Sequence, residues 1–110
     1  MSRREKLIEM LRDEPLDDFL NYAVACEDIR DGLADQAIRR LRELNARSPD
    51  YVPAWFRLGQ VLAEVGEVEV ACDVLEKGIR IASRAGDTHA AGEMSEFRAS
   101  LTAGGPAQQT

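Results

Sequence analysis

The chain has 110 residues, of which 31% are charged, and its formal net charge is -6 at pH 7. This length fits one domain, and the abundant alanine, leucine, glutamate and arginine favour helices, because most of these side chains lose little rotamer freedom in a helix. The acidic balance argues against a nucleic-acid partner, which requires a basic face, and leaves a basic peptide partner open.

Cysteine usage and hydropathy indicate a cytoplasmic protein. Cys26 and Cys72 lie far apart and form no CxxC pair, so we expect small apolar side chains rather than a disulfide framework. The first eleven residues carry basic side chains but no apolar run long enough for a signal peptide. No segment approaches the roughly 20 apolar residues that span a bilayer. We therefore expect a reducing compartment and no membrane partner.

A first helix is predicted over residues 1–14. Ser2 and Glu5 have the spacing of a capping box at its start, and Pro15 stops it. Its apolar face consists of Leu7, Ile8 and Leu11. A helix this short is not stable alone. We expect it to cover the N-terminal end of a larger array, with a dimer contact as the alternative.

Residues 16–49 predict a pair of helices. The first runs from about Leu16 to Arg30, with Pro15 near its first turn, where a missing N–H does no harm. Gly32 closes it, and the second helix follows from about Leu33 to Ala46. The segment 47–50 ends that helix, and Asp50 is a good N-cap for the next one.

A second pair is predicted over residues 50–85, with Gly66 between its two helices. Its second helix continues to about Ala85 and ends at Gly86, since Ser83 stands where the first pair has Pro49. A last helix over residues 87–102 starts at a cap formed by Asp87 or Thr88 and covers the exposed face of the second pair. We predict one domain over residues 1–102 and a disordered tail over 103–110.

The second pair carries a motif of large and small residues at fixed spacing. Its pattern is W-x2-L-G-x2-Y followed by A-x3-F, with leucine at both aromatic positions; the residues are Trp55, Leu58, Gly59, Leu62, Gly66, Ala71 and Leu75. At these residues the chain resembles the tetratricopeptide repeat (TPR) family. The resemblance implies an all-α fold, in which antiparallel helix-turn-helix repeats stack as a short right-handed α-solenoid. This chain would hold about two TPR units between N-terminal and C-terminal capping helices.

The two pairs superpose along the sequence without a gap at a shift of 34 residues. Small residues fall on small ones and large on large, as in Gly32/Gly66, Ala37/Ala71, Leu41/Leu75, Val24/Leu58, Ala25/Gly59 and Tyr22/Phe56. Such self-similarity at a fixed period is typical of a stacked solenoid. The first copy departs from the motif, because Asn21 occupies the tryptophan position and Asp28 the late aromatic position.

Groups for catalysis or metal binding are scarce. His89 is the only histidine and lies at a helix start, where a solvated or capping role is expected; no zinc spacing, GxGxxG or Walker loop is present. Glu27 and Asp28 are interpreted as a solvated helix face. The same interpretation applies to the arginines at 39, 40, 42 and 47, which Asp35 and Glu43 intersperse. We expect no enzyme, cofactor or metal.

The resemblance implies a binding groove along the first helix of each pair. Matching positions give the candidate groove residues Phe19, Tyr22, Cys26, Ile29, Arg30, Phe56, Gln60, Ala63 and Glu64, with Pro53 beside them. Helical spacing independently supports part of this set, since residues 22, 26 and 30, and likewise 56, 60 and 64, form i,i+4 rows on one face. The alternative is that Tyr22 and Phe56 pack between units or under the last helix.

The favoured function is a non-catalytic scaffold that binds a partner protein or peptide in this groove. The alternative is a self-associating module that forms a homodimer through the terminal helix or the groove. Gel filtration with light scattering separates the two. The sequence does not name the partner, because one fold serves many ligands.

Overall fold

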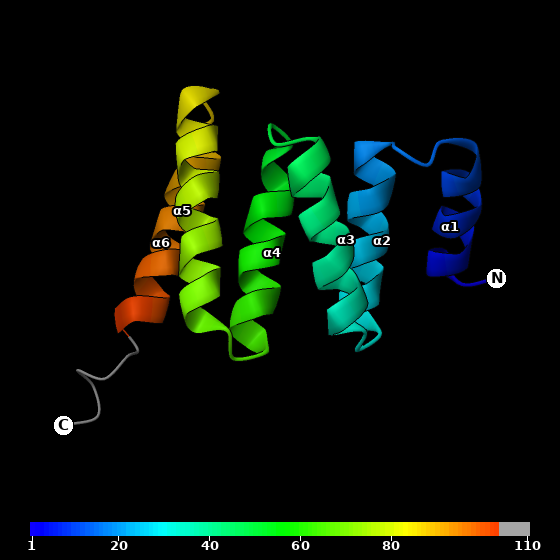
Figure 1. Cartoon of the computed structure of the whole chain (residues 1–110), viewed down its shortest axis with the longest axis horizontal. Coiled ribbons are helices and arrows are strands. Elements are labelled where there is room, and N and C mark those ends of the chain that lie inside the picture. The colour runs from blue at the N-terminus through cyan, green and yellow to red at the C-terminus, as the bar shows by residue number, and fades with distance from the viewer. Residues whose placement is uncertain (104–110) are drawn as a thin grey trace.

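The computed structural model describes residues 1–103, which form six helices and no strand. In chain order these are α1 (Arg3–Asp13), α2 (Asp18–Arg30), α3 (Ala34–Arg47), α4 (Val52–Glu64), α5 (Val68–Arg84) and α6 (Thr88–Ala103). The helices lie side by side along the longest of three axes of 51 × 32 × 19 Å (Figure 1). The predicted all-α solenoid of helical repeats is confirmed. Ala103 ends α6 rather than starting the tail, and residues 104–110 of that tail lie outside the described residues.

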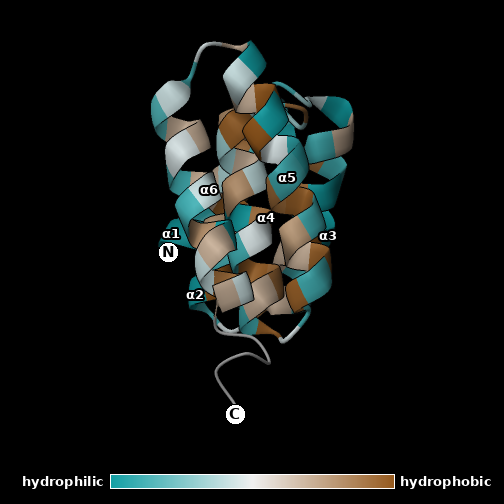
Figure 2. Cartoon of the chain, turned by 90° about the vertical axis from the view of Figure 1, so that its left-hand side faces the viewer, coloured by the Kyte–Doolittle hydropathy of each residue, from teal (hydrophilic) through white to brown (hydrophobic). Residues whose placement is uncertain are grey.

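The helices form two layers. Along the stack, α2 and α6 lie on one side and α3 and α5 on the other (Figure 2). Helix α4 contacts α2 and α6 within the first layer and also packs on α3 and α5. The first helices of successive units, α2, α4 and α6, are therefore neighbours, and together they form one outer surface of the molecule.

Small residues set the approach of α4 to α5. Ala71 is fully buried, and a Cβ added to Gly59 would lie 2.5 Å from Cδ2 of Leu75. Around this contact the core gathers buried residues from both repeats, among them Ala37, Leu41, Leu44, Leu58 and Leu62. The 34-residue alignment therefore pairs buried residues of the first repeat with buried residues of the second, such as Ala37 with Ala71 and Leu41 with Leu75, as the sequence predicts.

Three glycines end helices in the way that their positions predict. Gly32, Gly66 and Gly86 have φ angles of 78°, 90° and 78°, a left-handed conformation that glycine adopts without a steric penalty. The N–H group of the next residue in each case donates to a carbonyl five positions earlier. These bonds are Leu33 to Asp28 (2.8 Å), Glu67 to Leu62 (2.9 Å) and Asp87 to Ala82 (2.9 Å).

Helix starts agree with the sequence at two places and differ at two others. The Ser2 hydroxyl accepts from the Glu5 N–H at 3.1 Å, and Asp87 caps α6 by accepting from Ala90 at 3.1 Å. Helix α2 starts at Asp18 rather than near Leu16, because the Asp17 carboxylate caps it. The prediction that Asp50 caps α4 is wrong.

The turn before α4 explains that last difference. The N–H of Tyr51 donates to the Ser48 carbonyl at 3.0 Å, so Asp50 lies within the turn. Tyr51 then precedes the helix without a side-chain cap bond. Pro53 occupies the first turn of α4, where no N–H donor is needed.

The core of the first repeat includes a polar part around Asp28, called the polar core, which corrects the prediction that Asp28 and Arg40 are solvated. Asp28 is 0% exposed and accepts from Arg4 of α1, while Nε of Arg40 lies 3.9 Å from its second oxygen. Arg40 also donates to Asn21 at 3.2 Å. In the second repeat the position of Asp28 is taken by Leu62. A carboxylate at a core position needs charged partners, and α1 supplies one.

Helix α1 packs on α2 and covers the N-terminal end of the stack, the position predicted for it (Figure 1). Leu7 and Leu11 pack in one cluster with Leu20, Ala23 and Val24 of α2. The ion pair from Arg4 to Asp28 lies beside this contact, and Arg3 pairs with Glu27 at 2.7 Å. Helix α1 therefore docks through both apolar and ionic contacts.

Candidate functional site

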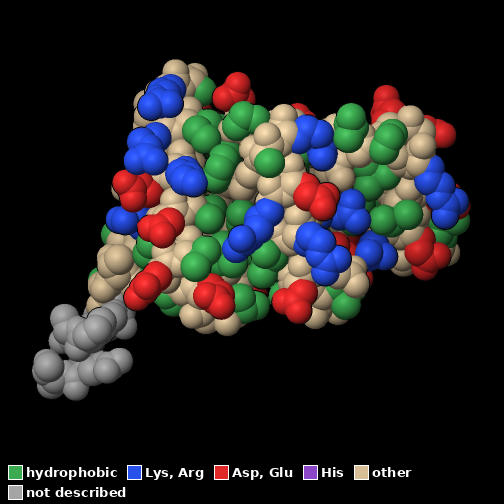
Figure 3. All heavy atoms as spheres, in the orientation of Figure 1, with side chains coloured by type: hydrophobic (Ala, Val, Ile, Leu, Met, Phe, Trp, Pro, Cys, Tyr) green, Lys and Arg blue, Asp and Glu red, His purple; other side chains and the backbone are tan. Residues whose placement is uncertain are grey.

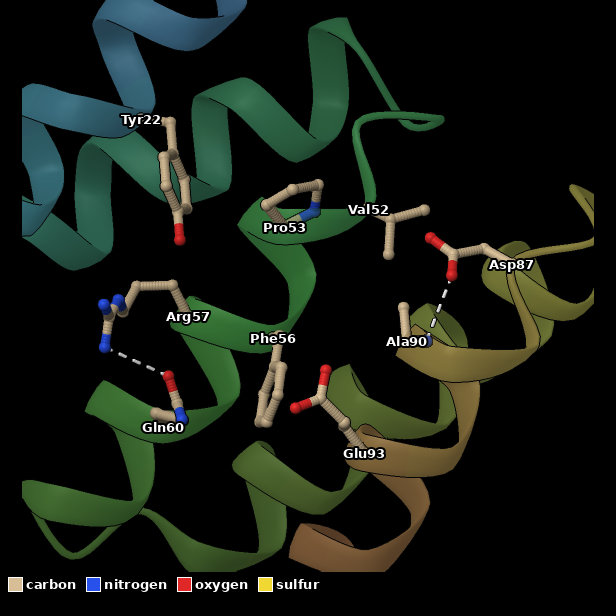
Figure 4. A pocket seen from close by; sticks show the side chains of 9 residues that line it. All are labelled: Tyr22, Val52, Pro53, Phe56, Arg57, Gln60, Asp87, Ala90 and Glu93. Atoms are coloured by element: carbon tan, nitrogen blue, oxygen red, sulfur yellow. Dashed lines mark hydrogen bonds between the residues drawn. The ribbon is translucent and has the colours of Figure 1, made fainter.

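A hollow of about 330 Å³ lies between α2, α4 and α6. We call this hollow the groove. Figure 4 shows the side chains that line it, which are Tyr22, Val52, Pro53, Phe56, Arg57, Gln60, Asp87, Ala90 and Glu93. A second hollow of about 300 Å³ continues along α4, shares Arg57 and Gln60, and adds Ala63, Glu64 and Phe97. Side chains one turn apart on α4 thus follow one surface from Pro53 to Glu64.

Helical periodicity separates this surface from the core. Phe56 and Gln60 lie four residues apart and share a face of α4, whereas Leu58 and Leu62 point inward and are only 2% exposed. Tyr22 lines the same hollow from α2 and occupies the position that Phe56 has one repeat later. The repeat therefore brings equivalent residues of two units to one surface.

Arg57 lines both hollows. Its guanidinium donates to Oε1 of Gln60 at 3.2 Å, and Figure 4 shows Tyr22 on the same side of the hollow. Burial alone lowers the pKa of Arg57, but its interactions with the side chains of Cys26 and Tyr22 outweigh burial and raise the pKa. This arginine is a permanent cation that its neighbours hold in place.

Tyr22 carries a neutral phenol beside this cation. Burial, followed by the neighbouring Cys26, raises the pKa of Tyr22, although Arg57 opposes the shift. Its ring packs edge-on against Tyr51, with the ring centroids 5.8 Å apart and the planes at 62°. At neutral pH the hydroxyl is therefore a hydrogen-bond donor and acceptor on a fixed ring.

The opposite wall is acidic and comes from α6 and its cap. Asp87 and Glu93 are both exposed, and Glu93 lies 3.3 Å from His89, whose side chain is 86% exposed. His89 is thus solvated, as predicted. With Glu64, the two hollows have three carboxylates around one arginine, an arrangement that favours a ligand carrying positive charge at the rim.

The two candidate aromatic residues both pack and line the groove. Phe56 contacts Phe97 of α6, with centroids 6.0 Å apart and planes at 55°, and Tyr22 contacts Tyr51. Both remain only partly buried. The two alternatives for these rings are therefore not exclusive, because a second ring fixes each one while part of its surface stays open.

The structure brings five of the nine candidate residues to the two hollows. Tyr22, Phe56 and Gln60 line the first, and Gln60, Ala63 and Glu64 the second. Cys26 lies beside Arg57. The other three line neither hollow: Phe19 is 59% exposed, Ile29 packs against the core, and Arg30 is exposed.

Sequence reasoning missed Arg57, Glu93 and Phe97. Arg57 lies three residues before Gln60, so an i,i+3 row includes it, whereas the i,i+4 rows do not. Glu93 and Phe97 are on α6, for which the sequence predicts only a covering role. The groove is lined by α2, α4 and α6, and α6 is the helix for which the sequence predicts the covering role.

Two absences characterise residues 1–103. No group of three or more histidine, cysteine, aspartate or glutamate side chains in this range is arranged to hold a metal ion. None of the helices there has the length and apolar character needed to cross a membrane.

Solved structures resemble this chain, although no family profile and no curated protein sequence matches it. A TPR domain protein from Salinibacter ruber, solved by NMR, is 26% identical and superposes with a TM-score of 0.78 over 81% of this chain and 90% of its own. A protein from Bordetella parapertussis is 25% identical and has a TM-score of 0.81, over 93% and 89%.

A third structure, the TPR2B domain of yeast Sti1 in a complex with pHsp70, shares the fold at 18% identity. Its TM-score is 0.84 over 97% of this chain and 82% of that one. With the 34-residue register and the helix-ending glycines, these structures show that the chain has the tetratricopeptide repeat fold.

Proposed function

We propose that this chain is a non-catalytic protein-interaction module that binds a short segment of a partner protein in the groove. The observation that carries the proposal is the continuous surface along α4, where hollows of about 330 and 300 Å³ share Arg57 and Gln60. The complex of the yeast Sti1 domain with pHsp70 supports a protein ligand for this fold.

The lining chemistry suits an extended peptide. Phe56 and Tyr22 offer fixed apolar rings, whose ordering costs little entropy on binding because neighbouring rings already hold them. Arg57 and Gln60 offer donors for peptide carbonyl groups. Asp87 and Glu93 attract a lysine or arginine of the ligand from the opposite wall.

The proposal is tested with a random peptide library panned against the purified protein. Enriched peptides are synthesised with a fluorophore, and their affinity is measured by anisotropy for wild type, Arg57→Met and Lys77→Met. Lys77 is an exposed residue of α5, so its substitution removes the same charge away from the groove.

Arg57→Met should weaken binding roughly 10-fold to 150-fold, the range for loss of a hydrogen bond to a charged group. Lys77→Met should bind like wild type. Equal effects of the two substitutions, or a library that yields no peptide better than its scrambled version, would contradict the proposal.

A homodimer is the second candidate, and exposed apolar residues at the N-terminal end favour it. Met10, Leu16 and Phe19 are 53%, 65% and 59% exposed. Light scattering during gel filtration should show 12.2 kDa for a monomer and twice that mass for a dimer. If a dimer forms, Phe19→Ser should dissociate it, and Arg57→Met should not.

A further inference from the structure

Arg57 differs from the other partly buried arginines, because it has no carboxylate partner. Four arginines of residues 1–103 are partly buried, namely Arg4, Arg40, Arg57 and Arg98. Arg4 and Arg40 both lie against Asp28, and Nη2 of Arg98 lies 3.7 Å from Glu76. No carboxylate of residues 1–103 forms an ion pair with Arg57. The groove therefore holds a cation without a counter-charge in the described part of the chain.

The neighbours of Arg57 position its guanidinium without neutralising it. Gln60 accepts a hydrogen bond from Nη1 at 3.2 Å, and Figure 4 shows the Tyr22 hydroxyl pointing towards Arg57. Neither the amide nor the phenol is negatively charged at neutral pH, since burial raises the pKa of Tyr22. A ligand that covers the groove removes water from Arg57, and a desolvated cation without a counter-charge weakens binding. A peptide carbonyl accepts a hydrogen bond from this cation, whereas a carboxylate also neutralises it.

The carboxylates of the two hollows also have no lysine or arginine partner. Among residues 1–103, Glu93 pairs with His89 alone, and Asp87 and Glu64 form no ion pair. On the face formed by α3 and α5, in contrast, Lys and Arg side chains lie among Asp and Glu side chains (Figure 3). The charges of the groove are therefore separated, and each sign is open to a charge on a ligand.

This separation of charge matches neighbouring side chains of an extended peptide. Figure 4 shows Phe56 between Arg57 and Glu93, so the two charges face a bound segment from opposite sides. Successive side chains of an extended segment point in opposite directions. A ligand residue that faces Arg57 is therefore adjacent in sequence to one that faces Glu93.

On the basis of the proposed function, we infer that the bound segment carries an aspartate or glutamate that pairs with Arg57 and, adjacent in sequence, a lysine or arginine that pairs with Glu93. The acidic residue supplies the counter-charge of Arg57. The basic residue offsets the repulsion between this acidic residue and the carboxylates of the groove. Because the two charges cancel, the net charge of -6 does not repel the segment as a whole.

The carboxylate belongs to a side chain rather than to the end of the partner chain. Arg57 lines both hollows, so a segment that follows them continues on both sides of it. One hollow reaches Pro53, and the other reaches Glu64, whose carboxylate repels a C-terminus. A terminal carboxylate on Arg57 would also leave one of the two hollows empty.

The first test repeats the panning of the random peptide library with variants of the two charged walls. Wild type should enrich peptides in which an acidic residue adjoins a basic one. Arg57→Met should lose the preference for the acidic residue and keep that for the basic one, and Glu93→Gln should do the reverse. Glu96→Gln is the matched control, because Glu96 is an exposed residue of α6 that lines neither hollow. It should enrich the same peptides as wild type.

The second test compares the best peptide with a version whose acidic residue is replaced by the matching amide. Both are acetylated and amidated, so neither has a charged terminus. The amide version should bind wild type roughly 10-fold to 150-fold more weakly, the range for loss of a hydrogen bond to a charged group. Arg57→Met should bind the two versions alike, because it lacks the partner of the carboxylate.

The outcomes separate this inference from the proposed function. Enriched peptides without adjacent acidic and basic residues would overturn the inference and leave the proposed function standing. Binding that requires a free C-terminus would also overturn it, as would equal affinity of wild type for the two versions. The same holds if the preference for the carboxylate survives in a folded Arg57→Met protein. A library that yields no binder would refute the proposed function, and the inference with it.

Discussion

Gly59 is the position at which the close contact of α4 and α5 can be tested by adding one carbon atom. The Cβ of an alanine there would lie 2.5 Å from Cδ2 and 2.6 Å from Cγ of Leu75. Because Cγ as well as a methyl group is in the way, turning the end of the leucine does not relieve the clash. Leu75 is 0% exposed, so either its whole side chain or α5 must move.

A second glycine isolates this steric cost. Gly92 lies in α6, and a Cβ there would meet nothing within 4 Å. In a helix interior, Gly→Ala alone stabilises by about 1 kcal/mol, which is the full effect expected for Gly92→Ala. Gly59→Ala gains the same amount and loses about 1–3 kcal/mol to overpacking. The difference in unfolding free energy between the two variants should therefore be about 1–3 kcal/mol.

Urea unfolding followed by circular dichroism measures this difference, provided that the slopes of the transitions agree. Thermal melts should separate the variants by about 4–8 °C per kcal/mol for a domain near this size. If both alanine variants were stabilised equally, α4 and α5 would not approach closely at Gly59, and the contact of Gly59 with Leu75 described above would be contradicted.

Two further predictions concern the polar core and the groove. Arg4→Met should lower the free energy of unfolding by about 3–5 kcal/mol, because it removes the closest partner of the fully buried Asp28 carboxylate. Adding Asp28→Leu, which introduces the residue found at Leu62 one repeat later, should recover most of this loss in urea unfolding. No recovery would argue against the ion pair. Burial raises the pKa of Tyr22, so the stability that the neutral phenol contributes is complete below its unfolded pKa of about 10 and is lost as pH rises through the folded pKa. Unfolding midpoints at alkaline pH should therefore fall more for wild type than for Tyr22→Phe. Parallel curves for the two proteins would place Tyr22 in solvent.

The repeat register could be predicted because its signals are local. Gly32, Gly66 and Gly86 mark helix ends through a backbone conformation that few other residues adopt. Ala71 and Gly59 mark the approach of two helices through their size. Each of these properties belongs to the residue itself, and the fixed spacing then repeats it along the chain.

The polar core could not be predicted, because it depends on a partner from outside the repeat. In the motif, Asp28 stands at a position for a large apolar residue, which signals a weaker contact. Only the docking of α1 brings Arg4 to it. No repeat pattern encodes that docking, so charge alone suggested a solvated face.

Trp55 shows a similar limit for the site. The motif predicts a scaffold residue, and Trp55 does pack against Gly78. Yet it is only partly buried and lines a hollow between α3, α4 and α5. Which part of a large side chain stays open depends on neighbours from the next helix, such as Val70, and the motif does not specify them.

Binding of a partner segment in the groove is the central claim, and NMR tests it most directly. Assigned amide and methyl signals of the protein are followed while the best peptide from the library is added. The largest shifts should fall on α2, α4 and α6, at Tyr22, Phe56, Gln60 and Glu93. Shifts concentrated on α3 and α5, or at the exposed end near Phe19, would contradict that claim.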